Sequence, residues 1–311
     1  MGCTARVLTI LAANWVASVI SAACFAGSLD STQEYLDAYR SDCAFGMTHV
    51  EVLRRHRVLL VPGYFSDLDS RYFLDQLNWL ASIGVEHEKL AVGSRQSVAI
   101  NAPIIATAIR NSPKPVILIT HSKGSVDALD ALRAQPSLRT KVKGWLSLQG
   151  AFFGSPVADM LLDGARLNPW LATVILGYFG GTMESAQRLT TGASLAYYRD
   201  NKSAIDEVVR QVPAIAFASA FDGATDGRPS TTLEIPLELM KRNGIRSDGL
   251  VPTDAAVLPG MAFVKTSGVD HIAPVMPAPQ AFDRVRMTTA LMLTLQLFRD
   301  LPADASCKGR R

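Results

Sequence analysis

A serine lies at the end of an apolar run in the segment VILITHSKGSVD, which covers residues 116–127. The apolar and β-branched residues predict a buried strand, and the residues after Ser122 predict a helix. A serine in such a strand-to-helix turn is held exposed above the sheet, where a neighbouring base can activate its hydroxyl as a nucleophile. The alternative is an ordinary helix N-cap, a position that also favours serine.

The sequence holds five histidines, and only His271 follows Ser122. A nucleophile on this kind of turn takes its base from later in the chain, in the order Ser, acid, His. His271 lies just after the last predicted strand, so we expect it to be the base. His121 adjoins the serine, and its side chain is expected to point away and pack. The remaining histidines, expected to be surface or satisfied buried residues, are His49, His56 and His87.

The acid of such a set is expected between the last two predicted strands, residues 213–220 and 262–268. Asp248 is the first choice, because its Ser-Asp-Gly turn can project a carboxylate that holds the imidazole tautomer. Asp222 is the second choice. Asp254 could equally cap the following helix, and Asp270 is too close to His271 in sequence to turn back onto it easily. The other acidic candidates in this interval are Asp226, Glu234 and Glu238.

A developing oxyanion needs backbone N–H donors beside the nucleophile. The residue after the serine, Lys123, supplies one, and Gly124 allows the helix to approach the strand closely. The turn in LLVPGYFSD would supply the second donor from Tyr64 or Phe65. A simple strand-ending turn is the alternative interpretation of that segment.

The elements that must position these residues alternate along the chain. Strands of nearly continuous apolar character alternate with helical segments, which predicts an α/β fold with a mostly parallel central sheet and helices on both faces. The alternation pauses at about residues 155–210, which predicts an inserted helical cap or lid. The strands are expected within 56–64, 86–94, 114–120, 142–152, 213–220 and 262–268, and the main helices within 28–43, 69–84, 97–112, 124–135 and 283–298.

The bulk composition fits one globular domain over residues 27–311. The chain has 311 residues, of which 48% are hydrophobic and 19% charged, and this balance disfavours disorder. Its net charge is only +3, without a basic block, so there is no electrostatic case for nucleic acid as a partner.

Residues 1–26 have the pattern of a secretory signal, with a short basic start, an apolar stretch and small residues near its end. Asn14 and Ser18 interrupt the apolar stretch, which favours a cleaved signal over a retained membrane anchor. Lipid attachment at Cys24 is the weaker form of anchoring, because Ser21 is a poor residue at its position. We therefore expect an exported protein, either periplasmic or extracellular.

Export leaves two cysteines in the mature chain, Cys43 and Cys307. In an oxidising compartment they could form one disulfide near the two termini, although two unrelated thiols are an equal alternative. Neither lies in a CxxC motif or a Cys/His cluster, so the sequence predicts no metal site.

Taken together, these segments resemble the α/β-hydrolase fold, and within it the bacterial lipase and esterase group. The resemblance covers most of residues 57–298. Two positions depart from the family pattern. Thr120 stands at the first glycine position of the family's nucleophile motif Gly-x-Ser-x-Gly, called the nucleophile elbow, and FFGSP stands where many lipases have Pro-His before Gly-Ser. The motifs that carry the resemblance are VPGYF, THSKG, GAFFGSPVAD, SDGLVP and VDHIAP.

The resemblance implies a hydrolase of carboxylic esters that uses Ser122, Asp248 and His271 and needs no cofactor. A Ca²⁺ site would resemble some lipases, but no acidic cluster in this sequence specifies one, so we expect none. Its partner would be a small ester or a lipid, with transient contact with a lipid surface. The apolar stretch at 168–183 could be a lid or acyl-chain pocket, or simply a core helix. Alternative activities are a polyester depolymerase, a thioesterase and a phospholipase, and a non-catalytic envelope binding protein is a further alternative.

Overall fold

The computed structural model describes residues 29–41, 45–64, 66–67, 69–167, 183–295 and 297–298. The predicted leader, the predicted disulfide pair Cys43 and Cys307, Phe65 and the stretch 168–182 lie outside the described residues. Of the helices in the described ranges, none combines the length and apolar character that a membrane span requires.

The centre of the fold is a six-stranded sheet in which every neighbouring pair is parallel, in the order β2-β1-β3-β4-β5-β6. The prediction of an α/β fold with a parallel sheet is therefore confirmed. The strands are β1 (Arg57–Val61), β2 (Glu86–Lys89), β3 (Val116–His121), β4 (Val142–Leu148), β5 (Ala214–Ala220) and β6 (Ala262–Ser267).

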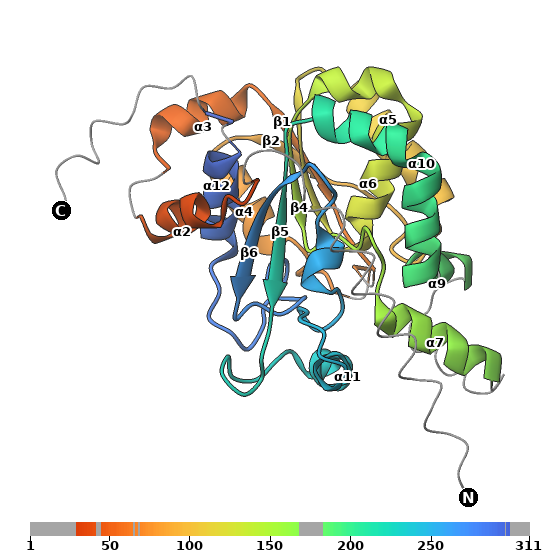
Figure 1. Cartoon of the computed structure of the whole chain (residues 1–311). Helices are drawn as coiled ribbons and strands as arrows, with labels where there is room; N and C mark the ends of the chain where they lie inside the picture. The colour runs from red at the N-terminus through yellow and green to blue at the C-terminus, as the bar shows by residue number, and fades with distance from the viewer. Residues whose placement is uncertain are drawn as a thin grey trace, which may run out of the picture.

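Helices cover both faces of the sheet (Figure 1). One face carries α2 (Thr32–Arg40), α3 (Met47–Arg54), α4 (Leu74–Ser82) and α12 (Arg284–Thr294), and the other carries α5 (Val98–Asn111), α6 (Lys123–Ala134) and α10 (Thr191–Gln211). Successive strand side chains point to opposite faces, so an uninterrupted apolar strand supplies both cores. In β1, Leu59 and Val61 pack with α5 and α6, whereas Val58 and Leu60 pack with α4 and α12.

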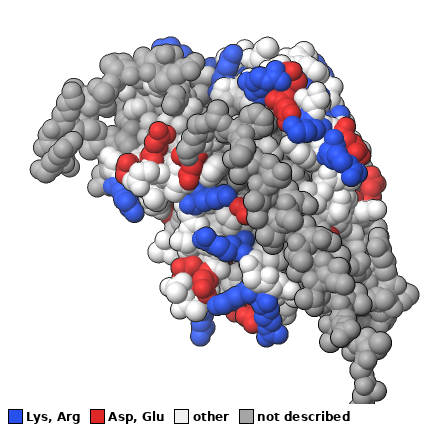
Figure 2. Space-filling view, in the orientation of Figure 1, with Lys and Arg blue, Asp and Glu red and all other residues white. Residues whose placement is uncertain are grey.

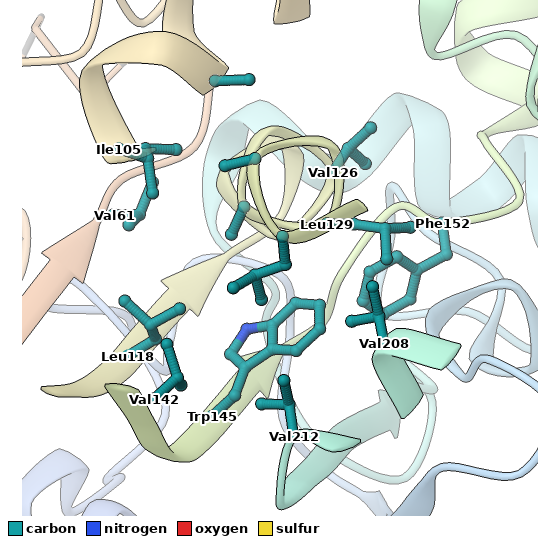
Figure 3. Packing of buried hydrophobic residues seen from close by; sticks show 14 of the residues in the cluster. Val61, Ile105, Leu118, Val126, Leu129, Val142, Trp145, Phe152, Val208 and Val212 are labelled. Carbon is teal, nitrogen blue, oxygen red and sulfur yellow. The ribbon is translucent and has the colours of Figure 1, made fainter. Parts of the chain in front are cut away.

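Trp145 of β4 is the largest side chain of the core beneath α6, where its ring lies among aliphatic residues (Figure 3). The indole is fully buried, and a buried N–H without an acceptor would be costly. Its Nε1 donates to Thr120 Oγ1 at 2.9 Å, and that hydroxyl lies 2.7 Å from Ser125 Oγ of α6. Thr120, which departs from the elbow glycine of the resembling family, therefore serves as a buried acceptor.

Shorter elements connect the layers around the carboxyl ends of the strands. Figure 1 shows β5 and β6 pointing towards the end of the molecule that carries α7 and α11. These elements are α7 (Pro156–Leu167), α9 (Met183–Arg188) and α11 (Glu234–Arg242), with 3₁₀ turns η1 (Pro136–Lys141), η2 (Thr231–Leu233) and η3 (Thr253–Ala256).

The predicted cap range contains α7, α9 and α10. The second half of α10 is more than a cap, because Ile205 and Val208 are buried in the same core as Trp145. This half of α10 therefore belongs to the core of the sheet rather than to a separate cap.

The helix predicted from residue 69 begins later, at Leu74. Tyr72 and Phe73 lie in the preceding turn, and Phe73 has a left-handed backbone with φ 65°. The turn is fixed from outside the helix, because the Phe73 N–H donates to the Val275 carbonyl at 2.8 Å. This tertiary contact outweighs the helical spacing of Tyr72 and Phe73 with later apolar residues.

Basic and acidic side chains are interspersed on the face shown in Figure 2. Exposed pairs such as Lys241–Asp222 and Lys265–Asp254 join opposite charges at 2.8 and 2.6 Å. Such exposed ion pairs add little stability.

Gly124 of α6 allows the helix to start directly against β1. A Cβ at this position would lie 2.5 Å from the Val61 carbonyl oxygen and 2.6 Å from that of Pro62, both backbone atoms. We expect Gly124→Ala to lower the free energy of unfolding by about 1–3 kcal/mol through this overlap, as measured by urea denaturation.

Gly192→Ala is the matched control, because a Cβ there would meet nothing within 4 Å. It lies in α10, where alanine is favoured over glycine, so we expect no loss and a gain of at most about 1 kcal/mol. Equal losses in the two variants would contradict the close-approach role of Gly124.

Candidate active site

The strand order places a natural binding position at the carboxyl ends of β1 and β3. The chain leaves β1 for β2 on one side and then crosses to β3 on the other, so the order reverses between these neighbours. Ligands of open α/β sheets bind at such a switch point. Here the two strands end at Pro62-Gly63-Tyr64 and at His121-Ser122-Lys123.

Ser122 has an unusual backbone, with φ 54° and ψ −125°. This conformation costs a non-glycine residue about 1–3 kcal/mol and persists only where the surroundings impose it. Backbone bonds fix it on both sides: the Ser122 N–H donates to the Leu148 carbonyl at 3.0 Å, and its own carbonyl accepts from the Ser125 N–H at 3.0 Å. Ser122 is the residue immediately before α6, as the sequence predicted.

The loop after β1 lies directly against this turn. A Cβ on Gly63 would come within 2.8 Å of both the Ser122 Cβ and the His121 carbonyl oxygen. Glycine is therefore required at this point of contact, which brings the predicted oxyanion loop beside the serine.

Asp248 and His271 lie in contact at the end of the sheet. The His271 Nδ1 is 2.8 Å from Asp248 Oδ2, and the two side chains are almost completely buried. An ionised carboxylate only accepts hydrogen bonds, so Nδ1 donates in this bond, which leaves Nε2 in the position of a base.

The Asp248 turn is itself well ordered by hydrogen bonds. Its second oxygen, Oδ1, accepts from the backbone N–H groups of Leu250 and Val251 at 2.9 and 2.8 Å. The His271 N–H donates to the Asp248 carbonyl at 2.9 Å, so main chain and side chain both join the two residues.

The other acidic candidates lie elsewhere. Asp222 pairs with Lys241 and Asp254 pairs with Lys265, in both cases at the surface. Asp226 accepts from the Asp222 N–H, and Glu238 pairs with Arg242. Glu234 begins α11, where it is exposed.

The structure brings Ser122 and His271 into one neighbourhood without a direct bond. Within the described residues, no hydrogen bond joins the Ser122 hydroxyl to the His271 ring, whose bond to Asp248 uses Nδ1. The ring of His121, the residue before the serine, lies 4.7 Å from the His271 ring between centroids. Catalytic hydrogen bonds are often long before substrate binds, so this geometry is compatible with a nucleophile and its base.

His121 is buried and hydrogen-bonded at both ring nitrogens, so it packs away from solvent as expected. Nδ1 contacts the Tyr72 hydroxyl, and Nε2 lies 2.9 Å from the His271 carbonyl oxygen. Burial, together with the nearby His271, holds the pKa of His121 well below its ordinary value, so the ring is neutral.

The candidate oxyanion donors are distributed over two loops. Lys123 is the first residue of α6, where a backbone N–H has no partner within the helix. In the other loop, the Gly63 N–H already donates to the Tyr72 hydroxyl at 3.0 Å, which leaves the later residues of that loop. Tyr64 is among them, and its hydroxyl lies 2.7 Å from Ser185 Oγ of α9.

The side chain of Lys123 forms a buried ion pair one turn along α6. Its Nζ lies 2.9 and 2.8 Å from the two oxygens of Asp127, and both side chains are 1% exposed. Burial lowers the pKa of Lys123 and raises the pKa of Asp127, while each charge opposes the shift in its partner. Asn101 of α5 donates a further bond to Asp127 at 2.8 Å.

Two residues that sequence reasoning did not select hold the His271 loop. The buried Asp270 carboxylate accepts from the backbone N–H groups of Ala273 and Ser230 at 2.9 and 2.7 Å. Gln149, which has φ 49°, donates from Nε2 to the Asp270 carbonyl at 3.1 Å. A polar residue directly after the apolar β4, followed by glycine, was the one sequence signal for Gln149.

The segment GSPVAD connects the cap to the acid turn. The Ser155 hydroxyl donates to the Leu250 carbonyl, and Asp159 accepts from the N–H and hydroxyl of Thr191 at 2.9 and 2.6 Å. Gly154 is required because a Cβ would lie 2.5 Å from the Thr190 carbonyl oxygen. Among the described residues, no cluster of three or more His, Cys, Asp or Glu side chains could hold a metal ion.

The Lys123–Asp127 pair gives a stability prediction. Asp127→Ala would leave a buried ammonium without its counter-ion, and we expect it to lower the free energy of unfolding by about 3–5 kcal/mol in urea denaturation. The double variant Lys123→Met/Asp127→Leu removes both charges with similar volumes and should recover most of that loss. A double variant as unstable as the single one would contradict the role of the unpaired charge.

The neutral state of His121 gives a pH prediction. Folded His121 stays neutral, whereas the unfolded residue takes up a proton below its ordinary pKa of 6.5, so acid favours the unfolded state. The free energy of unfolding should therefore decrease as the pH is lowered below about 6.5. The decrease from this group is up to about 1.4 kcal/mol per pH unit.

Urea denaturation between about pH 7 and pH 5 measures this slope. His121→Gln should show a shallower slope than the wild-type protein, because the titrating group is gone. The pKa of His56 is also lowered, mainly by burial, but its contribution is common to both proteins. Parallel slopes would contradict a neutral His121.

Comparisons with known proteins address the fold. No protein-family model and no curated protein matches the chain. Among solved structures, a metagenomic carboxyl esterase has a TM-score of 0.62 at 23% identity, over 80% of this chain and 77% of that one. The mature form of a lipase from Bacillus licheniformis has a TM-score of 0.59 at 18% identity, over 78% of this chain and 92% of that one. The parallel sheet, its switch point and these similarities together show that the chain has the α/β-hydrolase fold.

Proposed function

We propose that the protein is a serine hydrolase of carboxylic esters, with Ser122 as nucleophile, His271 as general base and Asp248 as the residue that orients it. One observation carries the proposal. A serine with a strained backbone lies at the switch point of the sheet, and the ring of the residue before it lies 4.7 Å from the ring of His271, whose Nδ1 is bonded to a buried carboxylate at 2.8 Å. Strain at such a position is a reason to infer function, because a structural serine has no need of it.

The first half of the reaction forms an acyl-enzyme. The Ser122 oxygen attacks the ester carbonyl while His271 Nε2 takes the hydroxyl proton, and Asp248 stabilises the resulting imidazolium. The carbonyl oxygen becomes an oxyanion, for which the N–H groups of Lys123 and of Tyr64 or Phe65 are the proposed donors. When the intermediate collapses, His271 returns the proton to the leaving alcohol.

The second half regenerates the enzyme with water. His271 Nε2 takes a proton from water as the hydroxide oxygen attacks the acyl-serine, and the same donors stabilise the second oxyanion. Collapse releases the carboxylic acid and returns the proton to Ser122. Every proton passes through the one free nitrogen of His271, so the cycle needs no metal or cofactor.

The compared structures support an ester as substrate, because one is a carboxyl esterase and the other a lipase. The apolar stretch at 168–183 favours a lipidic acyl chain, although most of it lies outside the described residues. Thioesters, phospholipids and polyesters would use the same nucleophile, so a substrate panel separates these activities. Export, signal cleavage and contact with a lipid surface belong to the same proposal, and N-terminal sequencing of secreted protein tests the first two.

Ser122→Ala tests the nucleophile. We expect the wild-type protein to hydrolyse p-nitrophenyl esters and to react with a fluorophosphonate probe, and the variant to lose both, with a rate at least about 10³-fold lower. Ser137→Ala, at an exposed serine of η1, is the matched control and should keep both properties. A wild-type protein inert to short and long acyl esters and to the probe would favour the non-catalytic alternative.

Acyl-chain preference tests the lipidic substrate. We expect the catalytic efficiency for the palmitate ester to equal or exceed that for the butyrate ester, because an apolar pocket gains about 0.8 kcal/mol per buried methylene. The measurement is kcat/KM for both p-nitrophenyl esters in the same detergent. A strong preference for butyrate would reject the lipase version and leave the esterase version.

A further inference from the structure

We propose that His121 is a positioning residue that joins the loop of the base to the predicted oxyanion loop. The connection is one chain of hydrogen bonds: the Gly63 N–H donates to the Tyr72 hydroxyl, that hydroxyl donates to His121 Nδ1, and His121 Nε2 donates to the His271 carbonyl. The inference rests on the proposed function and assigns a role to the residue before the nucleophile.

The direction of the chain follows from its two ends. The His271 carbonyl can only accept, so His121 Nε2 must carry a proton. The His121 ring is neutral, so Nδ1 has no proton and must accept from Tyr72. At the other end the Gly63 N–H can only donate, and the Tyr72 oxygen accepts it at 3.0 Å while giving its own proton to Nδ1. Each hydrogen bond of the chain therefore has one direction.

The chain joins residues of four segments, one of them Tyr72 in the turn before α4. Gly63 follows β1, His121 ends β3, and His271 lies in the loop after β6. His121 is covalently attached to Ser122. The main chain of His271 is thus held by the residue before the proposed nucleophile, whereas Asp248 holds the His271 ring through Nδ1.

Burial makes this connection specific. His121 and Tyr72 are 3% and 2% exposed, so water cannot readily replace a lost partner. Without the His121 donor, the His271 carbonyl would lose its bond at 2.9 Å, and the loop would lose one of the bonds that fix its position. A displacement of about 1 Å between reacting groups can lower a rate about 100-fold.

The test compares variants that keep or remove the donor. His121→Leu removes both ring nitrogens, whereas His121→Gln can place its amide N–H near the position of Nε2. We expect His121→Leu to lower kcat about 10–100-fold with KM changed less than about 3-fold, and His121→Gln to recover at least a tenth of the wild-type kcat. Active sites are counted with a fluorophosphonate, so that kcat refers only to folded, reactive protein.

Tyr72→Phe tests the second half of the chain. We expect a smaller loss of kcat, and the double variant His121→Leu/Tyr72→Phe should be no slower than His121→Leu, because both changes break the same connection. Independent effects that multiply would contradict a single chain. The matched controls are His87→Gln and Tyr35→Phe, which lie outside this network and should keep wild-type kcat.

A second measurement does not depend on activity. In ¹⁵N-histidine NMR spectra of the full chain, His121→Gln identifies the His121 signals by their absence, and we expect the neutral Nε2–H tautomer at pH 7. The Nδ1–H tautomer would overturn the proposal even in an active enzyme, as would an unchanged kcat per site in His121→Leu. If Ser122→Ala retained full activity, the proposed function would fail, while the tautomer result would still stand.

Discussion

The strained turn at Ser122 is the constraint on which the surrounding structure depends. A residue with φ 54° is unfavourable by itself, so the elements on either side must hold it. They do so through backbone bonds to β4 and through the direct contact of α6 with β1 at Gly124. The contact in turn requires strands with apolar residues on both faces, because tightly packed cores on both sides keep β1, β3 and α6 in fixed register.

Buried polar groups around this turn are numerous, and almost all have partners. Asp248, Asp270 and Gln149 each make bonds that hold a loop rather than only neutralise a charge. The loops at the carboxyl ends of the strands also bury apolar residues such as Val251, Val269 and Val275, and the hydrogen bonds add a directional constraint to that packing. The Lys123–Asp127 pair lies within α6, and its carboxylate also accepts from Asn101 of α5, so this bond joins the two helices.

The order of motifs in the sequence was enough to predict the sheet and to bring Ser122, Asp248 and His271 to one end of it. Those residues follow from local rules: a strand-to-helix turn, an Asp-Gly turn, and a single histidine downstream. The roles of Tyr72 and Asp270 could not be predicted in this way, because they bond to His121 and Ser230, which are distant in sequence. The start of α4 was misplaced for the same reason, since Val275 fixes the turn before it.

Thr120 has a consequence for how sequences of this kind can diverge. Its hydroxyl is the acceptor of the Trp145 indole N–H, so the identities at the two positions are linked. A relative with glycine at the first elbow position would leave an indole at 145 without its partner, at a cost of about 1–3 kcal/mol. Positions 120 and 145 should therefore covary, with tryptophan retained at 145 only where residue 120 has a hydroxyl. Sequences with both residues would form a lineage in which the turn at the nucleophile and the core beneath it evolved together.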